Sequence, residues 1–578
     1  MRRRSFLQGL AAPEFSARRP DDGLASANGR RTLRVYFIKP SKYDTDGTLL
    51  QYRWGVIPSN TLIVLGGLNA AYAATRPEID LQTVLWDEVV DGVLARQVIA
   101  SIRRRAKEDG VEVVIGIAGI QSNQYPRARD IALQCKAEGL AVILGGFHIS
   151  SHQPSQDFLT SVGMTVAIGE AETTWMEILD DYLSSGLRAV YRVTDGVRAK
   201  TGAGEVTVPH IQEAPLPMVD SRYTRRFFNP TFSTIDTSRG CPFVCSYCSV
   251  KNVMGRSMRA RDPQRVVAWL RDAHDRHGIT NFLVVDDDFY RSPGWEAVLQ
   301  GLAQLRREGL DLFCILQTDI ESSAYADTPL APREYAKHRR SRRFVELAAA
   351  AGCFEVFMGF ESFSPANLEA ASKFHNEDLG DRGLGTSTTD AIRDRVKERY
   401  RRAVESWHKV GVGVHCGYII GMQFDEPGCG TQAARDLADI GVDIASFFAY
   451  TPLPGTEDYD DAESAGAIFD RDFNNYDSAR FVSRHPRLTT GELQREYRDA
   501  YRTFYSWRRL AWSLISLYGV TGLTSAARYG MLAQQLYYTY SDRRGWHPML
   551  GGIWRIRDSR TRRQAITDAD AARLFLAV

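Results

Sequence analysis

Three cysteines stand close together in the segment SRGCPFVCSYCSV (238–250), at Cys241, Cys245 and Cys248, with the spacing C-x-x-x-C-x-x-C. A closed zinc site takes four ligands and a four-iron cluster takes four thiolates, yet no fourth cysteine is near. Three thiolates can hold three irons of a four-iron, four-sulfur cluster and leave the fourth iron open for chemistry. The alternative is a structural zinc site completed by a distant residue such as Cys416 or a histidine.

The elements that must position these cysteines form an alternating series of strands and helices from 229 to 465. Its apolar strand segments are TFSTIDTS, ITNFLVVDDD, LDLFCILQTD, FEVFMGFES, VGVHCGYIIG and VDIASFFAYTP. Six strand–helix units cannot close an eight-stranded barrel, so we expect a partial (β/α)6 barrel with functional residues at the strand carboxyl ends. The cysteine triplet follows the first of these strands.

An earlier alternating series, residues 31–190, predicts a separate doubly wound, Rossmann-like α/β domain with a parallel sheet covered on both faces. Ligands of such sheets lie beyond the strand carboxyl ends, here the turns GIQSN (119–123), GGFHIS (145–150) and GEAET (169–173). No G-x-G-x-x-G fingerprint follows the first strand, which argues against an ordinary dinucleotide site. Residues 191–228 are expected to form a linker, residues 466–578 a helical C-terminal region, and residues 1–30 a disordered tail.

Composition narrows the class of partner. The 578 residues carry 72 Lys and Arg against 70 Asp and Glu, a formal charge of +2, so no basic excess indicates nucleic-acid binding. Eight cysteines are too few for a disulfide scaffold and indicate a reducing, cytoplasmic compartment.

No stretch is long enough to span a membrane. The aromatic segment FYSWRRLAWSLISLYG (504–519) predicts core packing, with capping of a hydrophobic substrate or peripheral membrane contact as alternatives.

The cysteine spacing, with the aromatic Tyr247 just before the last cysteine and a strand before the first, resembles the signature of radical S-adenosylmethionine (SAM) enzymes. The resemblance implies that Cys241, Cys245 and Cys248 bind a 4Fe-4S cluster whose open iron is chelated by SAM. It also implies that one electron, from a donor such as flavodoxin or ferredoxin, cleaves SAM to methionine and a deoxyadenosyl radical. Tyr247 would pack near the adenine.

Further positions match the family's SAM contacts. The strand end VVDDDF places Asp286, Asp287 and Asp288 where members hold the methionine ammonium, although three adjacent carboxylates also suit a helix N-cap. Glu361 in GFES resembles the ribose or methionine contact. Gly417 and Gly421 in GYIIG resemble the segment beside the adenine, or else are ordinary strand glycines at bulges.

The N-terminal domain is similar to the cobalamin-binding domain that precedes the radical core in one subgroup. The matching segments AGIQSNQYPRARDIA, VILGGFHIS and AIGEAETTWMEIL imply cobalamin contacts at Ser122, Gly145, Gly146, His148, Gly169 and Glu170. The D-x-H-x-x-G motif that supplies the cobalt ligand is absent, and DAHDRHG (272–278) has the wrong spacing. Cobalamin is therefore expected to bind without a lower ligand from the protein, and His148 is not expected to coordinate cobalt. The alternative is a degenerate domain that binds no cobalamin.

The subgroup chemistry implies methylation of an unactivated carbon of a small or hydrophobic metabolite, with the methyl group passing through cobalamin. Ring-forming or oxidative chemistry without methyl transfer is the second hypothesis. A non-enzymatic, zinc-bound scaffold is the third. The sequence identifies neither the substrate nor a catalytic residue beyond the cofactor contacts.

Overall fold

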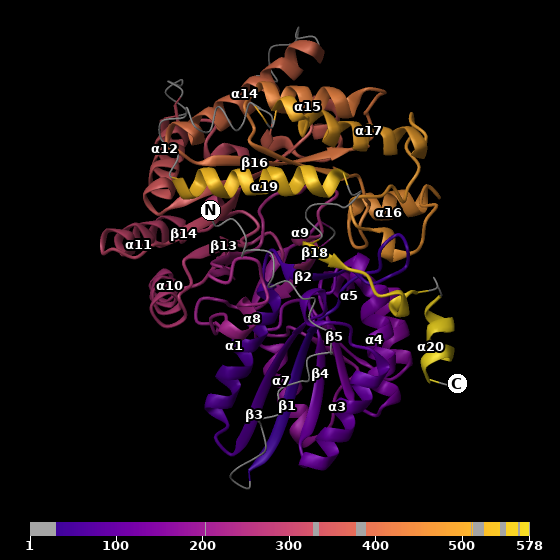
Figure 1. Ribbon diagram of the computed structural model, residues 1–578. Coiled ribbons are helices and arrows are strands. Elements are labelled where there is room, and N and C mark those ends of the chain that lie inside the picture. Colours follow the sequence, from indigo (N-terminus) through magenta and orange to yellow (C-terminus); the bar gives the residue numbers. More distant parts are fainter. Residues whose placement is uncertain are drawn as a thin grey trace, which may run out of the picture.

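The computed structural model describes residues 30–202, 204–327, 335–376, 389–509, 511, 525–543, 551–563 and 567–576. The predicted tail therefore lies outside the described residues except for Arg30, and so does most of the aromatic segment after 509. Two six-stranded parallel sheets dominate the chain, one in the lower, indigo-to-violet half of Figure 1 and one in the magenta-to-orange half. The α/β class and the two-sheet architecture predicted from sequence are confirmed.

The N-terminal sheet has the strand order β3-β1-β4-β5-β6-β7. Apolar side chains point from both of its faces, as the unbroken β-branched runs require. One face packs on α1 and α7, and the other on α3, α4 and α6. The elements are β1 (Arg31–Lys39), α1 (Asn60–Thr75), β3 (Ile79–Asp87), α3 (Arg96–Asp109), β4 (Glu112–Ile117), α4 (Tyr125–Ala137), β5 (Ala141–Gly145), α5 (Phe147–Ser151), α6 (Gln153–Ser161), β6 (Thr165–Ile168), α7 (Thr174–Ser184) and β7 (Val190–Arg192).

The second sheet has its strands in chain order, β10-β13-β14-β15-β16-β17, all parallel, as a partial barrel requires. Its helix-facing side is the largest hydrophobic core of the described residues. The elements are β10 (Phe232–Ile235), α10 (Pro263–His277), β13 (Asn281–Val284), α11 (Trp295–Arg307), β14 (Phe313–Thr318), α12 (Tyr335–Ala350), β15 (Cys353–Glu361), α13 (Pro365–Ala370), α14 (Thr389–Lys409), β16 (Gly413–Ile420), α15 (Cys429–Asp439), β17 (Ile444–Ala449) and α16 (Glu457–Ser464).

The stretch 191–228 is more structured than a plain linker. It begins in β7, continues through a hairpin of β8 (Val197–Lys200) and β9 (Glu205–Val208), and ends with the short helix α8 (Ser221–Thr224). The Asp220 side chain caps α8 by accepting a hydrogen bond from the Arg222 backbone N–H. The proline-rich part between them runs past α1, where Met218 donates its backbone N–H to Ile63.

The C-terminal region is not purely helical, and it returns to the N-terminal domain. Helices α17 (Thr490–Phe504) and α19 (Ser525–Arg543) pack against the barrel, and the yellow α19 crosses it in Figure 1. Strand β18 (Gly552–Ile556) then pairs antiparallel with β2 (Gln51–Gly55), and α20 (Asp568–Leu576) packs on α4. Strand pairing over such a sequence separation leaves no local signal, which is why the prediction of a helical region missed it.

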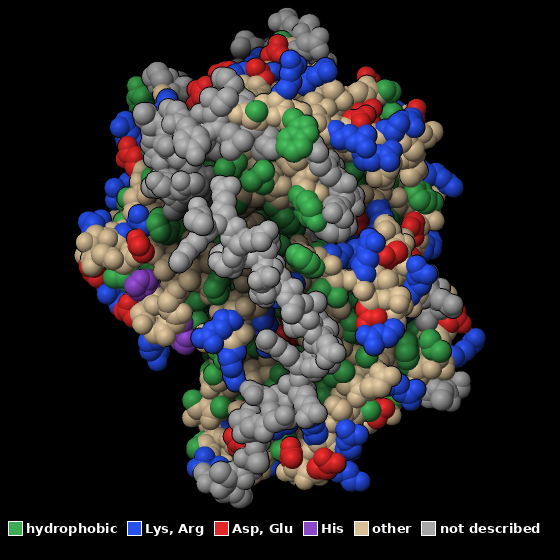
Figure 2. All heavy atoms as spheres, viewed as in Figure 1, with side chains coloured by type: hydrophobic (Ala, Val, Ile, Leu, Met, Phe, Trp, Pro, Cys, Tyr) green, Lys and Arg blue, Asp and Glu red, His purple; other side chains and the backbone are tan. Residues whose placement is uncertain are grey.

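Two surface properties bear on partners. In the face that Figure 2 shows, Lys and Arg side chains are interspersed with Asp and Glu among the described residues, without a continuous basic stripe. In the part of the chain that the structure describes, no helix is both long enough and apolar enough to cross a bilayer.

Candidate active site

The three cysteines lie on the loop that follows β10. Two short strands, β11 (Ser238–Arg239) and β12 (Arg259–Ala260), pair antiparallel and bring the two ends of this loop together. Gly240 opens it with φ +92°, and a Cβ atom there would lie 2.5 Å from the Ser257 carbonyl oxygen, so the turn requires glycine. The Cys241 N–H donates to Gly255, and the Cys248 N–H donates to Cys245.

Burial raises the pKa of all three thiols. For Cys248 the pKa reaches about 12, because desolvation is joined by the negative field of Cys245. Such thiols become thiolates when a metal compensates their charge, which suits cluster ligands better than free nucleophiles. Among the described residues no three His, Cys, Asp or Glu side chains converge as ligands of a single ion. Cys416, the candidate fourth zinc ligand, is instead buried in the hydrophobic core.

The three aspartates after β13 separate into different roles. Asp286 is fully buried, and its carboxylate accepts hydrogen bonds of 2.6 Å from the Thr237 N–H, the Thr237 hydroxyl and the Ser238 hydroxyl. This carboxylate therefore fixes the chain just before the cysteine loop, and these three bonds use most of its capacity to accept, which argues against the predicted ammonium contact. Burial nevertheless raises the pKa of Asp286 to about 6.

Asp287 is the aspartate turned toward the cysteine loop. Burial, then the charges of Asp286 and Glu170, raise its pKa to about 7, while the Gly240 backbone N–H opposes this rise. Its charge in turn raises the pKa of Cys241 and Cys248. Asp288 lies deeper beside Asp319, whose charge adds to burial in raising the Asp288 pKa. Asp287 and Asp288 therefore both stay candidates for a cofactor contact, since each raises the pKa of Cys241 and Asp288 Oδ1 is buried without a hydrogen-bond partner among the described residues.

Glu361 and Lys373 form a buried pair beside the cysteines. Glu361 ends β15 at a bulge, with φ +61°, and its Oε1 accepts a 2.8 Å hydrogen bond from Lys373 Nζ. Burial opposes the charge of Lys373, but Glu361 and then Cys245 outweigh it and raise the Lys373 pKa. The pKa of the Tyr247 hydroxyl is also raised, first by burial and then by the negative charge of Glu361. Gly359 makes room for the pair, since a Cβ there would lie 2.3 Å from Glu361 Oε1.

The β16 glycines have packing reasons that the sequence did not reveal. A Cβ on Gly417 would lie 3.1 Å from the Phe357 ring and 3.4 Å from that of Phe448. Gly421 has φ +89°, and a Cβ there would meet Phe481 at 2.6 Å. Between the two glycines, Ile419 packs with Ala371 and Met422, and Tyr247 packs against this group. The segment thus contributes to the group of side chains against which the predicted adenine-side tyrosine packs.

At the carboxyl edge of the N-terminal sheet, Ser122 and His148 are brought together. Ser122 Oγ lies 3.2 Å from His148 Nδ1, and Ser155 Oγ lies 3.0 Å from Nε2. Burial lowers the His148 pKa well below its ordinary value. Because both ring nitrogens are engaged, His148 has none left for cobalt. The ring packs on Tyr125 and on Phe473, a residue from beyond the barrel.

The glycines of this edge differ in purpose. Gly146 has φ +141°, and a Cβ there would lie 2.2 Å from the Ile120 nitrogen. Only glycine therefore lets the GGFHIS turn pack against the GIQSN turn. Gly169, with φ +86°, has no atom within 4 Å of the place where its Cβ would stand. Nearby in sequence, the buried hydroxyls of Ser151 and Thr173 have no hydrogen-bond partner in the protein. An open glycine edge and two orphaned hydroxyls fit a polar ligand there.

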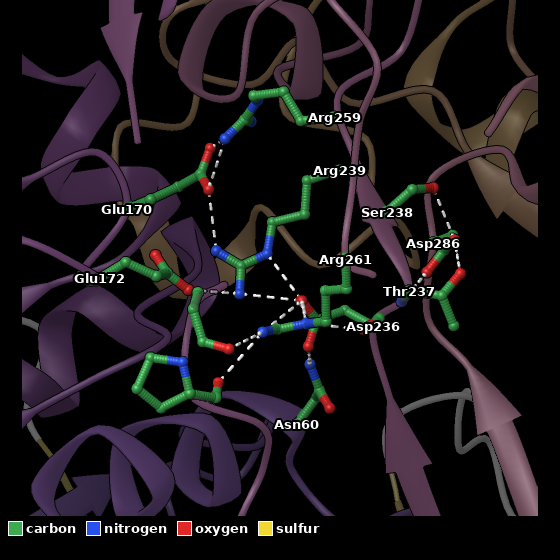
Figure 3. Close-up of polar contacts among 12 residues, drawn as sticks. Asn60, Glu170, Glu172, Asp236, Thr237, Ser238, Arg239, Arg259, Arg261 and Asp286 are labelled. Carbon is green, nitrogen blue, oxygen red and sulfur yellow. Dashed lines mark hydrogen bonds and ion pairs between the residues drawn. The ribbon is translucent and has the colours of Figure 1, made fainter. Parts of the chain in front are cut away.

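Glu170 does not point to that edge. Its carboxylate binds Arg239 at 2.8 Å and Arg259 at 2.5 Å, both in the barrel domain (Figure 3). Its predicted role as a cobalamin contact is therefore replaced by an interdomain one. Sequence reasoning missed Lys373, Arg239 and Arg259. The arginines flank the cysteine motif and could have been suspected, whereas Lys373 lies on a turn after α13 and carries no local signal.

A six-stranded partial barrel with a cysteine triplet after its first strand, joined to a doubly wound domain, places three thiols where they can hold an iron–sulfur cluster with one open iron. Residues 235–427 match the Radical SAM superfamily, so this part of the chain is a radical SAM domain and the protein is an enzyme. A radical SAM domain implies a 4Fe-4S cluster and SAM as cofactors, and it removes the zinc-scaffold hypothesis.

Three similar proteins extend the match beyond the barrel. A bacteriochlorophyllide d C-8(2)-methyltransferase of Chlorobaculum tepidum is 23% identical over 77% of this chain and 90% of its own length. An anaerobic magnesium-protoporphyrin IX monomethyl ester cyclase of Rubrivivax gelatinosus is 20% identical over 82% and 77%. The solved structure of the cobalamin-dependent SAM radical enzyme OxsB, with aqua-cobalamin and SAM bound, superposes with a TM-score of 0.57. The two sequences are 16% identical, and the match covers 89% of this chain and 72% of OxsB, so the likeness is one of fold.

Proposed function

We propose that this enzyme binds cobalamin in addition to the cluster and SAM, and methylates an unactivated carbon of a small or hydrophobic metabolite. The observation that carries the proposal is the junction in Figure 3. There the GEAET turn, at the carboxyl edge of the N-terminal sheet, binds directly to the two ends of the cysteine loop. Two cofactor sites on these elements would face one interface, as radical transfer between them requires.

In this proposal Cys241, Cys245 and Cys248 would hold the cluster, which would supply the one electron needed for reductive cleavage of SAM. Glu361 and Lys373 place a carboxylate and an ammonium beside Cys245, and these charges complement the methionine ammonium and carboxylate of SAM. Tyr247 and Ile419 form an apolar surface next to them for the adenine. Burial of these groups excludes water from a reactive radical.

Cobalamin would lie on the edge formed by Ser122, Gly145, Gly146 and Gly169, where it supplies the methyl group. The orphaned hydroxyls of Ser151 and Thr173 would donate to its polar substituents. No lower ligand comes from His148, because Ser122 and Ser155 occupy both of its ring nitrogens. All eight cysteines are free, which supports a reducing compartment such as the cytoplasm. In this proposal a flavodoxin or ferredoxin would be the electron donor.

The test uses protein reconstituted anaerobically with iron, sulfide and cobalamin, then incubated with SAM and a reductant. The proposal predicts about one retained cobalamin per chain and formation of both deoxyadenosine and S-adenosylhomocysteine. The similarity to the magnesium-protoporphyrin cyclase favours a second candidate, ring formation without methyl transfer. That candidate predicts retained cobalamin and deoxyadenosine but no S-adenosylhomocysteine. Failure to retain cobalamin would overturn both.

A further inference from the structure

Six charged side chains are buried together where the two domains meet (Figure 3). Each is at most 9% exposed. The N-terminal domain contributes two carboxylates and the barrel domain contributes one carboxylate and three guanidiniums: Glu170, Glu172, Asp236, Arg239, Arg259 and Arg261. Buried charges must be paired, so this cluster places a strong constraint on how the two domains dock.

Arg239 and Arg259 stand at the two ends of the cysteine loop. They are direct partners in the antiparallel β11–β12 ladder, so two like charges face each other across the strands. Such pairs are destabilising unless a counter-charge lies between them. Glu170 supplies it: Oε2 accepts from Arg239 at 2.8 Å and from Arg259 at 3.0 Å, and Oε1 accepts from Arg259 at 2.5 Å.

The ion pairs of this cluster are completed by carboxylates from across the domain interface. Within the barrel domain, ion pairs with these guanidiniums come from one carboxylate, that of Asp236, which binds Arg239 and Arg261. Asp287 lies close enough for the charge of Arg239 to lower its pKa. Glu170 and the second GEAET carboxylate, Glu172, which lies 2.6 Å from Arg239, bring the balance to three against three. Without these two carboxylates, Arg259 would have no ion-pair partner among the described residues, and Arg239 would share Asp236 with Arg261 at the base of the cysteine loop.

We propose that Glu170 is an interdomain latch: docking of the N-terminal domain closes the base of the cysteine loop and holds Cys241, Cys245 and Cys248 in place for cluster assembly. The latch rests on the proposed cluster role of these cysteines. It makes cluster retention depend on a residue of the other domain. Glu170 acts through Arg239 and Arg259, so it is a positioning residue and not a catalytic one.

The first test uses the full-length apo chain, in which alkylation rates of single cysteines are followed by mass spectrometry. Glu170→Gln should raise the alkylation rates of Cys241, Cys245 and Cys248 about tenfold over wild type. Cys135 and Cys416, in the cores of the two domains, should stay protected and report intact folds. The matched control is Glu177→Gln, which removes an exposed carboxylate paired with Arg188 in the same domain and should change none of these rates.

The double variant Glu170→Gln/Arg259→Gln separates the latch from general destabilisation. It removes one charge of each sign, leaving Arg239 and Arg261 against Glu172 and Asp236. The latch predicts loop alkylation within about threefold of wild type in this variant, even where Glu170→Gln alone unfolds. Double-variant rates as high as those of Glu170→Gln, or a Glu170→Gln chain that alkylates like wild type, would overturn the proposal.

A second readout keeps the latch distinct from the proposed function. After reconstitution, iron loss to a chelator should be about tenfold faster in Glu170→Gln than in wild type and near wild type in the double variant. A wild-type protein that forms deoxyadenosine but shows no effect of Glu170→Gln refutes the latch and leaves the enzyme assignment intact. A wild-type protein that assembles no cluster contradicts the proposed cluster role of the cysteines. The alkylation rates of the apo protein still test the latch in that case.

Discussion

Replacing Lys373 by Met should destabilise the apo protein and weaken SAM binding together. Lys373 Nζ lies 2.8 Å from Glu361, and the two side chains are 11% and 12% exposed. With an effective dielectric constant of 20, two unit charges at that separation attract by about 6 kcal/mol. The desolvation that the pair has already undergone offsets part of this attraction. Loss of one partner from a buried pair therefore costs about 3–5 kcal/mol.

The assay is a double-mutant cycle on the apo protein, with Lys373→Met, Glu361→Gln and the double variant compared by urea unfolding. Each single substitution should cost about 3–5 kcal/mol, because each leaves a buried charge without its partner. The double variant should cost less than the sum by about 2 kcal/mol, the range of coupling found for contacting groups. Costs that simply add, within about 0.5 kcal/mol, would refute the buried pair and with it the charge complement proposed for SAM.

Other parts of the structure give further predictions. Asp286→Ala should cost about 3 kcal/mol and lower iron content after reconstitution, because three hydrogen bonds at the start of the cysteine loop are lost; unchanged unfolding would contradict this. For His408, burial lowers the pKa but the contact with Asp443 outweighs it and raises the pKa. The advantage of wild type over His408→Gln, about 1 kcal/mol or less at this partly exposed site, should be complete below pH about 6.5 and vanish as the pH rises through the raised pKa; urea midpoints measure it, and a pH-independent difference would refute it. His148→Phe should leave the electron paramagnetic resonance spectrum of bound cob(II)alamin unchanged, whereas loss of a nitrogen coupling would show a histidine ligand.

The sequence predicted the fold where its signal was local. Strand segments such as VEVVIGIAG and FEVFMGFES are β-branched or aromatic and end at turns, and both lie where strands β4 and β15 are found. The pairing of β18 with β2 could not be predicted, because the two strands are about 500 positions apart and no local pattern indicates which strand each one pairs with. The return of the chain onto the N-terminal domain was missed for the same reason.

Within the site, the motif predicted which residues gather but not which way their side chains point. Asp286, Asp287 and Asp288 are adjacent and chemically identical, yet one fixes the preceding strand end, one faces the cysteine loop and one pairs with Asp319. Glu170 lies in a turn at the ligand edge but binds arginines of the other domain. Such choices depend on tertiary partners, which spacing does not encode.

The central claim, that three cysteines hold a cluster that cleaves SAM, is tested most directly by comparing wild type with Cys245→Ala after anaerobic reconstitution. Iron per chain and deoxyadenosine formed after reduction with SAM present are measured in both. We predict about four irons and steady deoxyadenosine formation in wild type, with both largely lost in the variant. Wild-type protein that binds zinc and forms no deoxyadenosine, or a variant as active as wild type, would contradict the account.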